Sequence, residues 1–116
     1  MNQRKWITAI ASTLVFTLFA VIAYRAFSPR PVEASTVEVK IDNFSFSPAT
    51  ITVKTGTQII WMNHDDIPHT VVEENKAFKS KVLDTDEKFT FTFAKPGTYN
   101  YYCSIHPKMT AKIVVK

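Results

Sequence analysis

The stretch Cys103-Ser104-Ile105-His106-Pro107-Lys108-Met109 decides how the rest of the chain is interpreted. It contains the only cysteine of the 116 residues, one of three histidines and one of three methionines. A thiolate, an imidazole and a thioether therefore fall within one short segment. Two histidines and one cysteine in a plane, with a weak axial methionine, form the ligand set of blue-copper electron-transfer sites. The stretch thus predicts a metal-binding turn.

A second histidine ligand has to come from elsewhere in the chain, and two residues compete for the role. His69 follows Pro68 and precedes a short run rich in valine, so it lies where a loop enters a strand. His64 lies beside an asparagine and two aspartates, which is a solvated setting. We expect His69 rather than His64 as the ligand. The predicted metal ligands are His69, Cys103, His106 and Met109.

The type of metal follows from the donor atoms. A buried cysteine is ordinarily an inert small hydrophobe, but Cys103 has a histidine three positions on and a methionine six positions on. That spacing lets one turn curl around one ion. Structural zinc favours paired cysteine and histidine ligands in a tetrahedron. A single thiolate with a thioether suits copper, so we expect one copper ion.

Residues 1–34 differ in composition from the rest of the chain. A basic head precedes an uncharged run from Trp6 to Tyr24, which Arg25 closes. This order is typical of an export signal, and the run approaches the ~20 residues that span a bilayer. Two interpretations stand side by side: a signal peptide cleaved after Ala34, or a hydrophobic helix retained as a membrane anchor through residues 6–24. Each includes a linker with two prolines.

Both interpretations place residues 35–116 outside the cytoplasm, in the periplasm or on the outer side of the cytoplasmic membrane. This segment is long enough to hold one core. The formal net charge of +4 comes mostly from the leader, because residues 35–116 contain ten lysines and nine acidic residues. No arginine-rich face remains for nucleic acid. We expect a monomeric domain at 35–116.

From Ser35 onward the pattern is one of strands and turns. Apolar residues alternate with polar ones in 37–41, 50–54, 88–93 and 111–116, and residues 58–62 are apolar on both faces. Period two places Cys103 on the same face as Tyr99 and Tyr101. Leu83 and Val82 are expected to pack inside, and Asp65, Asp66, Glu73 and Glu74 to form a solvated acidic edge. Seven or eight short strands predict an all-β, Greek-key β-sandwich.

Four motifs stand out over most of residues 36–115. They are Trp61-Met62-Asn63, Pro68-His69-Thr70-Val71, Phe93 with Pro96-Gly97-Thr98-Tyr99, and Tyr102-Cys103-Ser104-Ile105-His106-Pro107-Lys108-Met109. Together these motifs resemble the cupredoxins, the small blue copper proteins. The two-residue gap before Met109 is similar to that of the amicyanins, whereas plastocyanins have a longer gap there.

The resemblance implies a β-sandwich with copper near one end, bound by His69 and His106 through ring Nδ1, by Cys103 through sulfur and by Met109 axially. It implies that the edge of His106 is the electron port, set in an apolar patch near Pro68 and Pro107. It also implies that the Thr70 amide donates a hydrogen bond to the Cys103 sulfur. Two positions depart from the pattern: many relatives have asparagine where this chain has Thr70, and glycine where it has Ala111.

We therefore expect an electron carrier with redox proteins as its electron donor and acceptor. An extracytoplasmic copper carrier or chaperone would use the same ligands, and the sequence discriminates weakly between the two. An enzyme, such as a copper oxidase or nitrite reductase, needs an open copper position or a second metal. Only His64 is spare, so we predict no catalytic residue.

Overall fold

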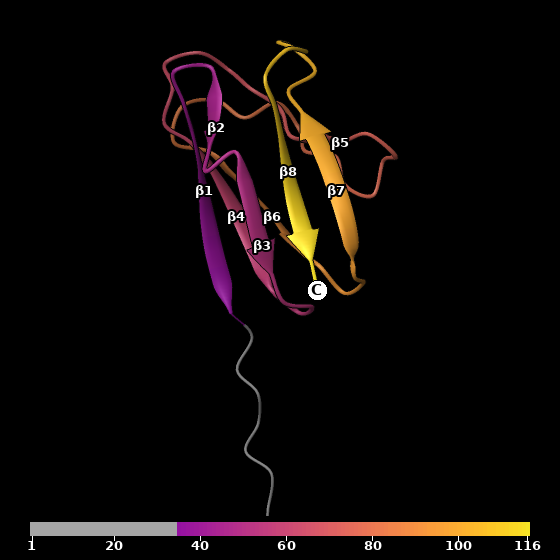
Figure 1. Ribbon diagram of the computed structural model, residues 1–116. Helices are drawn as coiled ribbons and strands as arrows, with labels where there is room; N and C mark the ends of the chain where they lie inside the picture. The colour runs from indigo at the N-terminus through magenta and orange to yellow at the C-terminus, as the bar shows by residue number, and fades with distance from the viewer. Residues whose placement is uncertain (1–34) are drawn as a thin grey trace, which may run out of the picture. The chain divides into compact units, whose positions relative to one another are not determined.

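The computed structural model describes residues 35–116, so the expected leader, linker and hydrophobic helix in residues 1–34 lie outside the described residues. Residues 35–116 contain eight strands and no helix, hence none long and apolar enough to cross a membrane. The strands form two sheets, ordered β2-β1-β4-β6 and β3-β8-β7-β5 (Figure 1). The predicted all-β sandwich of seven or eight strands is confirmed. The strands are β1 (Thr36–Asp42), β2 (Ser45–Ser47), β3 (Thr50–Val53), β4 (Gln58–Asn63), β5 (Val72–Glu73), β6 (Lys88–Thr92), β7 (Gly97–Tyr102) and β8 (Thr110–Val115).

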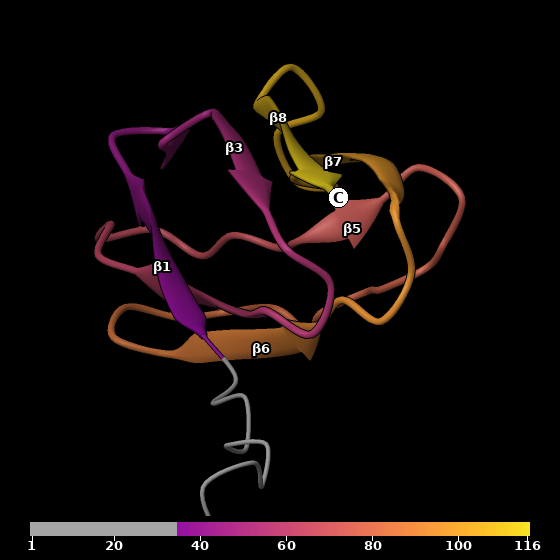
Figure 2. The same cartoon turned by 60° about the horizontal axis from the view of Figure 1, so that its bottom comes forward.

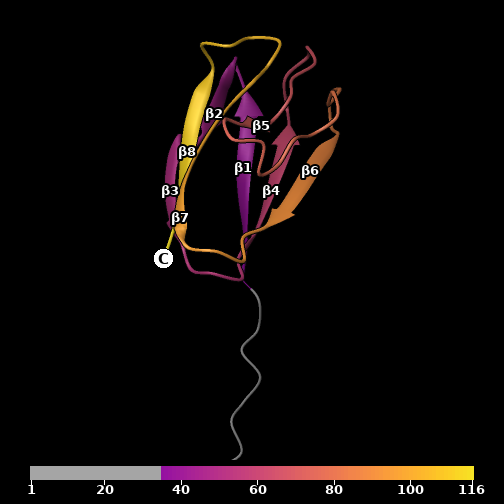
Figure 3. The same cartoon turned by 90° about the vertical axis from the view of Figure 1, so that its right-hand side faces the viewer.

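The two sheets form separate layers, with β1 and β6 in one and β3, β7 and β8 in the other (Figures 2 and 3). Successive side chains of a strand point to opposite faces, so one face of each strand lies in the core. Trp61 of β4 is fully buried and lies 5.6 Å from the Tyr101 ring of β7, measured between ring centroids. The two sheets therefore meet through aromatic packing at the centre of the domain.

Each sheet contains one parallel strand pair, because the chain repeatedly crosses from one layer to the other. β1 runs parallel to β4 with Val39 opposite Trp61, and β3 runs parallel to β8 with Ile51 opposite Ile113. β1 and β4 therefore end at the same edge. That end of the sandwich carries the β1–β2 turn, the β4–β5 loop and the β7–β8 loop (Figure 1).

The opposite end of the sandwich holds both ends of the described chain. The Gln58 amide donates to the Ser35 carbonyl at 2.9 Å, and the Thr55 amide donates to the Lys116 carbonyl at 3.0 Å. Gly56 turns the chain between them with φ at +87°, which only glycine adopts at little cost.

Two expectations about burial were wrong. Leu83 is buried, but Val82 is 51% exposed. The backbone of Leu83 pairs with that of His69, so its side chain points inward and its neighbour points outward. The expected acidic edge is also divided, because Asp65 and Glu73 are buried. The Glu73 carboxylate accepts hydrogen bonds from the backbone amides of residues 75 and 77, which stabilises the turn there.

Candidate metal centre

Cys103 leaves the end of β7 pointing into the space between the sheets. It follows Tyr101 with the period of two expected for a strand, and both side chains are buried. Cys103 has no solvent exposure and forms no disulfide. The predicted inward direction of the thiol is confirmed. The sulfur is therefore placed by a sheet and protected by the core.

His69 is brought to the same place by the strand-like pairing of its backbone with Leu83. The two residues exchange amide–carbonyl hydrogen bonds of 2.8 and 3.1 Å, and the His69 ring is fully buried. Its Nδ1 lies 3.7 Å from the Cys103 sulfur. Metal bonds of about 2.3 Å to sulfur and about 2.0 Å to nitrogen, at a trigonal angle, would set the two donors about 3.7 Å apart. The pair fits a metal ion between its donor atoms.

The electrostatic setting of Cys103 favours a thiolate. Burial by itself would raise the pKa of the thiol, because it removes water from the charged form. Hydrogen bonds from the Thr70 amide, from His69 and from the backbone of His106 and Ile105 outweigh burial, so the pKa of Cys103 lies below its ordinary value. The Thr70 amide donates to the sulfur at 3.3 Å. A thiolate is the form that binds metal.

Asp65, which the sequence reasoning placed in solvent, is buried against the His69 ring. One carboxylate oxygen accepts a hydrogen bond from the Phe44 amide at 3.0 Å and lies 2.8 Å from His69 Nε2. The Phe44 amide and then His69 hold the pKa of Asp65 below its ordinary value. Histidine ligands commonly donate their second ring nitrogen to a carboxylate, which fixes the ring orientation and leaves the other nitrogen for the metal. The signal available in the sequence was an acidic residue four positions before the predicted ligand His69.

The loop that carries His106 and Met109 is closed by its own backbone. The Cys103 amide donates to the Met109 carbonyl at 3.1 Å, and the Met109 amide donates to the His106 carbonyl at 2.9 Å. Met109 is buried, whereas His106 is half-buried. The ring centroids of His106 and His69 are 5.3 Å apart. The loop thus brings an imidazole and a thioether to the same end of the sandwich as Cys103.

Phe44, in the β1–β2 turn, covers both imidazoles. Its ring lies edge-on to His69 and His106 at centroid distances of 5.8 and 5.1 Å. Its backbone is left-handed, with φ at 56°, and its side chain is 51% exposed. Ile105, beside His106 in the chain, is 44% exposed. The surface around His106 therefore presents two large apolar side chains. An apolar patch was expected here near Pro68 and Pro107, but without Phe44 and Ile105.

The structure brings the predicted ligands together unequally. Within residues 35–116, no group of three or more His, Cys, Asp and Glu side chains is arranged to hold a metal ion. His69 and Cys103 face each other with their donor atoms, Nδ1 and sulfur, 3.7 Å apart. Binding of His106 and Met109 to the same ion stays a prediction. His64 points elsewhere: its ring is exposed and lies 3.6 Å from Glu38.

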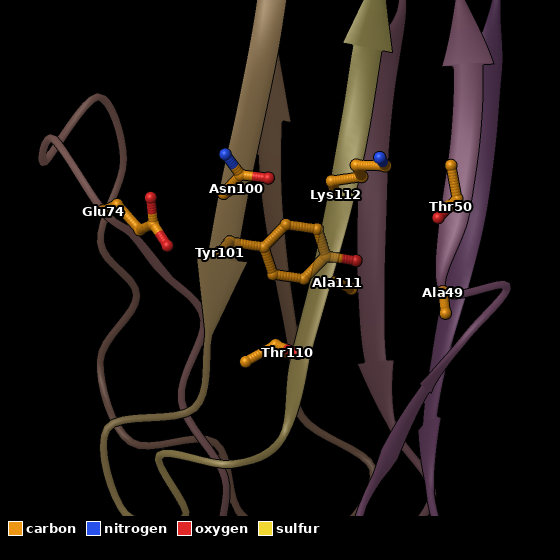
Figure 4. Close-up of a pocket in the computed structure, with 8 residues that line it drawn as sticks. All are labelled: Ala49, Thr50, Glu74, Asn100, Tyr101, Thr110, Ala111 and Lys112. Carbon is orange, nitrogen blue, oxygen red and sulfur yellow. The ribbon is translucent and has the colours of Figure 1, made fainter.

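A hollow of about 370 Å³ on the second sheet is not part of this site. Figure 4 shows its lining, in which Glu74 and Asn100 stand on one side and Lys112 and Thr50 on the other. The lining contains no histidine, cysteine or methionine. It therefore offers none of the soft or imidazole donors that copper prefers.

Comparison with known proteins gives the same family as the motifs. Residues 11–115 match the sequence model of the cupredoxin-like domain. The chain is 28% identical to amicyanin from Paracoccus versutus, with 93% of each chain covered. It is 30% identical to chloroplastic plastocyanin from Tetradesmus obliquus, covering 97% of this chain and 89% of that protein.

Solved structures agree with this assignment. The reduced Cu(I) form of an amicyanin variant has a TM-score of 0.67 and 27% identity, covering 73% of this chain and 86% of that one. A Cu-containing nitrite reductase from Thermus scotoductus has a TM-score of 0.68 and 30% identity, covering 77% of this chain but 24% of the enzyme. Both neighbours are described as copper proteins.

Proposed function

Because the chain belongs to the cupredoxin-like domain family, we propose that it is a type 1 blue copper protein that carries single electrons between redox proteins outside the cytoplasm. One copper ion is held by His69, Cys103, His106 and Met109. The observation that carries this proposal is the buried pair of donors, His69 Nδ1 and Cys103 sulfur, 3.7 Å apart. Bound copper supplies a one-electron Cu(II)/Cu(I) couple with a potential tuned by its surroundings.

The proposed ligands have different roles. His69 is fixed by its bridge to Leu83 and Cys103 by its place directly after β7, so their separation changes little when the charge of the site changes. His106 is half-buried between the exposed Phe44 and Ile105, so a redox partner can approach its ring across an apolar surface. We propose that monomers dock transiently through this surface and exchange electrons there.

The test is to load the purified full-length protein with Cu(II) and record its visible spectrum and its voltammogram. We expect an intense blue colour and a reversible one-electron wave. A protein that binds copper but stays colourless would overturn the proposed ligand set. A blue protein without a reversible wave would overturn the electron-transfer role.

A copper carrier or chaperone is the alternative outcome. It predicts rapid loss of copper to a chelator together with no reversible wave. An enzymatic role has less support, since the nitrite reductase neighbour matches this chain over only 24% of its own length. We propose a non-enzymatic carrier with no catalytic residue.

The position of the protein in the cell rests on residues 1–34. We propose that it is exported, to the periplasm or to the outer side of the cytoplasmic membrane. Mass spectrometry of the native protein distinguishes the two forms of the leader: a mature chain beginning at Ser35 indicates cleavage, and the intact mass indicates a retained anchor. A full-length protein recovered from the cytoplasm would overturn the proposal.

A further inference from the structure

The Thr70 hydroxyl lies between the Cys103 sulfur and the loop that follows it. Thr70 is buried, being 5% exposed. Its Oγ1 accepts a hydrogen bond from the Ser104 amide at 2.7 Å and lies 2.7 Å from the Ser104 hydroxyl oxygen. The same Oγ1 lies 3.8 Å from the Cys103 sulfur, in a geometry suited to donation. The direction of the Thr70 hydroxyl proton therefore determines whether the Cys103 sulfur accepts a second hydrogen bond.

The protons can be assigned by counting donors and acceptors. A threonine hydroxyl has one proton and two lone pairs. If the Ser104 amide and hydroxyl both donate to Thr70 Oγ1, both lone pairs are used and the Thr70 proton is free for the sulfur. In the reverse arrangement the Thr70 proton points to Ser104, and the sulfur loses this donor. The first arrangement gives the buried sulfur a second donor, while the exposed Ser104 keeps the lone pairs of its own hydroxyl for water.

We propose that Thr70 is a positioning residue whose side-chain hydroxyl donates a second hydrogen bond to the Cys103 sulfur, with the Ser104 hydroxyl orienting it, and that this pair favours the reduced state of the site. The inference rests on the proposed function, because it needs a copper ion on Cys103. It concerns the side chains of Thr70 and Ser104, in addition to the hydrogen bond from the Thr70 amide.

The direction of the effect follows from charge. A reduced site carries one more electron than an oxidised one, and hydrogen bonding around the cysteine sulfur is one of the features that set the potential of such sites. The positive end of a hydroxyl dipole near the sulfur stabilises the electron-rich state. Cys103 is fully buried, and the low dielectric around it strengthens this electrostatic effect. A hydrogen bond from Ser104 to Thr70 also polarises the Thr70 hydroxyl, which makes it a stronger donor.

The first test uses the metal-free protein and does not depend on redox chemistry. Proton NMR should show a Thr70 hydroxyl proton that exchanges slowly with water and has a cross-peak to the Cys103 β protons. Thr70→Val should lose this signal, and Ser104→Ala should keep the cross-peak. A Thr70 hydroxyl proton with cross-peaks only to Ser104 would overturn the proposal.

The second test compares reduction potentials of copper-loaded variants. Thr70→Val should lower the potential, with a tenfold change in the ratio of Cu(I) to Cu(II) affinity corresponding to about 59 mV. Thr70→Ser keeps the hydroxyl and should restore most of the value. Thr92→Val, at an exposed position of β6, is the matched control and should leave the potential unchanged.

The reduction potential of Ser104→Ala distinguishes the two directions of the hydrogen bond between Ser104 and Thr70. This measurement remains informative if Thr70→Val folds poorly. In the proposed arrangement the variant loses the polarising donor, so the potential falls by less than in Thr70→Val. In the reverse arrangement it frees the Thr70 proton for the sulfur, so the potential rises. A rise, or no change in either variant, would overturn the inference. A wild-type protein that is not blue would overturn the proposed function while leaving the NMR test valid.

Discussion

The two halves of the candidate metal centre are built differently. His69 and Cys103 have no solvent exposure; His69 is held by its backbone bridge to Leu83, and Cys103 directly follows the paired strand β7. The loop that carries His106 is closed by two of its own hydrogen bonds and leaves Ile105 44% exposed. An electron carrier needs both properties, since one half has to retain the ion and the other has to meet a partner. In the proposed carrier, retention of the ion and exchange of electrons would therefore belong to different elements of one small domain.

The largest expected effect comes from removing the buried sulfur. Cys103→Ser replaces the thiolate with a hydroxyl that stays protonated, so the intense visible band of the copper-loaded protein should disappear altogether. Absorption spectroscopy measures the band, and circular dichroism checks that the strands remain. A variant that stays blue would show that the sulfur is not a ligand and that the comparison between the two halves has no basis.

The second largest effect concerns the free energy of unfolding, which should depend more on the buried half of the site than on the exposed half. Leu83 is buried against His69, so Leu83→Ala should cost about 2–5 kcal/mol of unfolding free energy, through lost burial and a cavity. Ile105→Ala, in the exposed half, should change it by no more than about 0.5 kcal/mol. Denaturant unfolding of the metal-free protein measures both. Equal losses would mean that the loop is part of the core.

The core behind the buried half should also weaken at high pH. Burial, partly offset by the nearby Trp61 N–H, raises the pKa of Tyr101 to about 12 from an ordinary 10.0. Neither the Tyr101 hydroxyl nor Trp61 Nε1 has a hydrogen-bond partner within bonding geometry. The unfolded chain therefore releases this proton first, and stability falls as the pH rises from 10.0 to about 12. The loss should approach about 2–3 kcal/mol.

Tyr101→Phe isolates that contribution. Unfolding of the variant in denaturant should lack this part of the alkaline decline, whereas Tyr99→Phe, at a half-buried position of the same strand, should retain it. At neutral pH, Tyr101→Phe should be close to neutral in stability, because the hydroxyl it removes has no partner. Identical alkaline profiles for wild type and Tyr101→Phe would contradict the assignment.

The smallest expected effect lies at the exposed edge. Phe44→Ala removes two edge-on ring contacts with the histidines, each worth about 0.5–1.5 kcal/mol when buried. Because Phe44 is 51% exposed, the measured loss of stability should fall at or below that range. Phe44→Leu keeps most of the apolar surface and is the matched control. Unshifted His106 ring protons in the NMR spectrum of Phe44→Ala would show that the rings do not touch.

Alternation of apolar residues was sufficient to predict the fold. It placed the strands of the sandwich and turned the Cys103 side chain inward, because period two is a property of any strand. It failed for Val82. The isolated bridge between Leu83 and His69 turns the Leu83 side chain inward and leaves the adjacent Val82 exposed. Such isolated bridges have no periodic signal in the sequence.

The site was predicted less completely than the fold. Residue type and spacing singled out His69 and Cys103, whose chemistry is carried by their own side chains. Asp65 and Phe44 were missed because their roles depend on a contact between the β1–β2 turn and the β4–β5 loop, about 20 residues apart in the chain. The polar neighbours of Asp65 in the sequence suggested that it is solvated. The structure shows that one of its carboxylate oxygens contacts both the Phe44 amide and His69 Nε2.

Both ends of the described chain meet the sandwich beside Gly56, at the end away from Cys103. A fusion tag or surface linker attached at either terminus would therefore leave the apolar face around His106 unobstructed. Immobilised through such a linker on an electrode, the domain would expose that face to dissolved partners, whereas direct adsorption through the face itself would give the fastest current and block those partners.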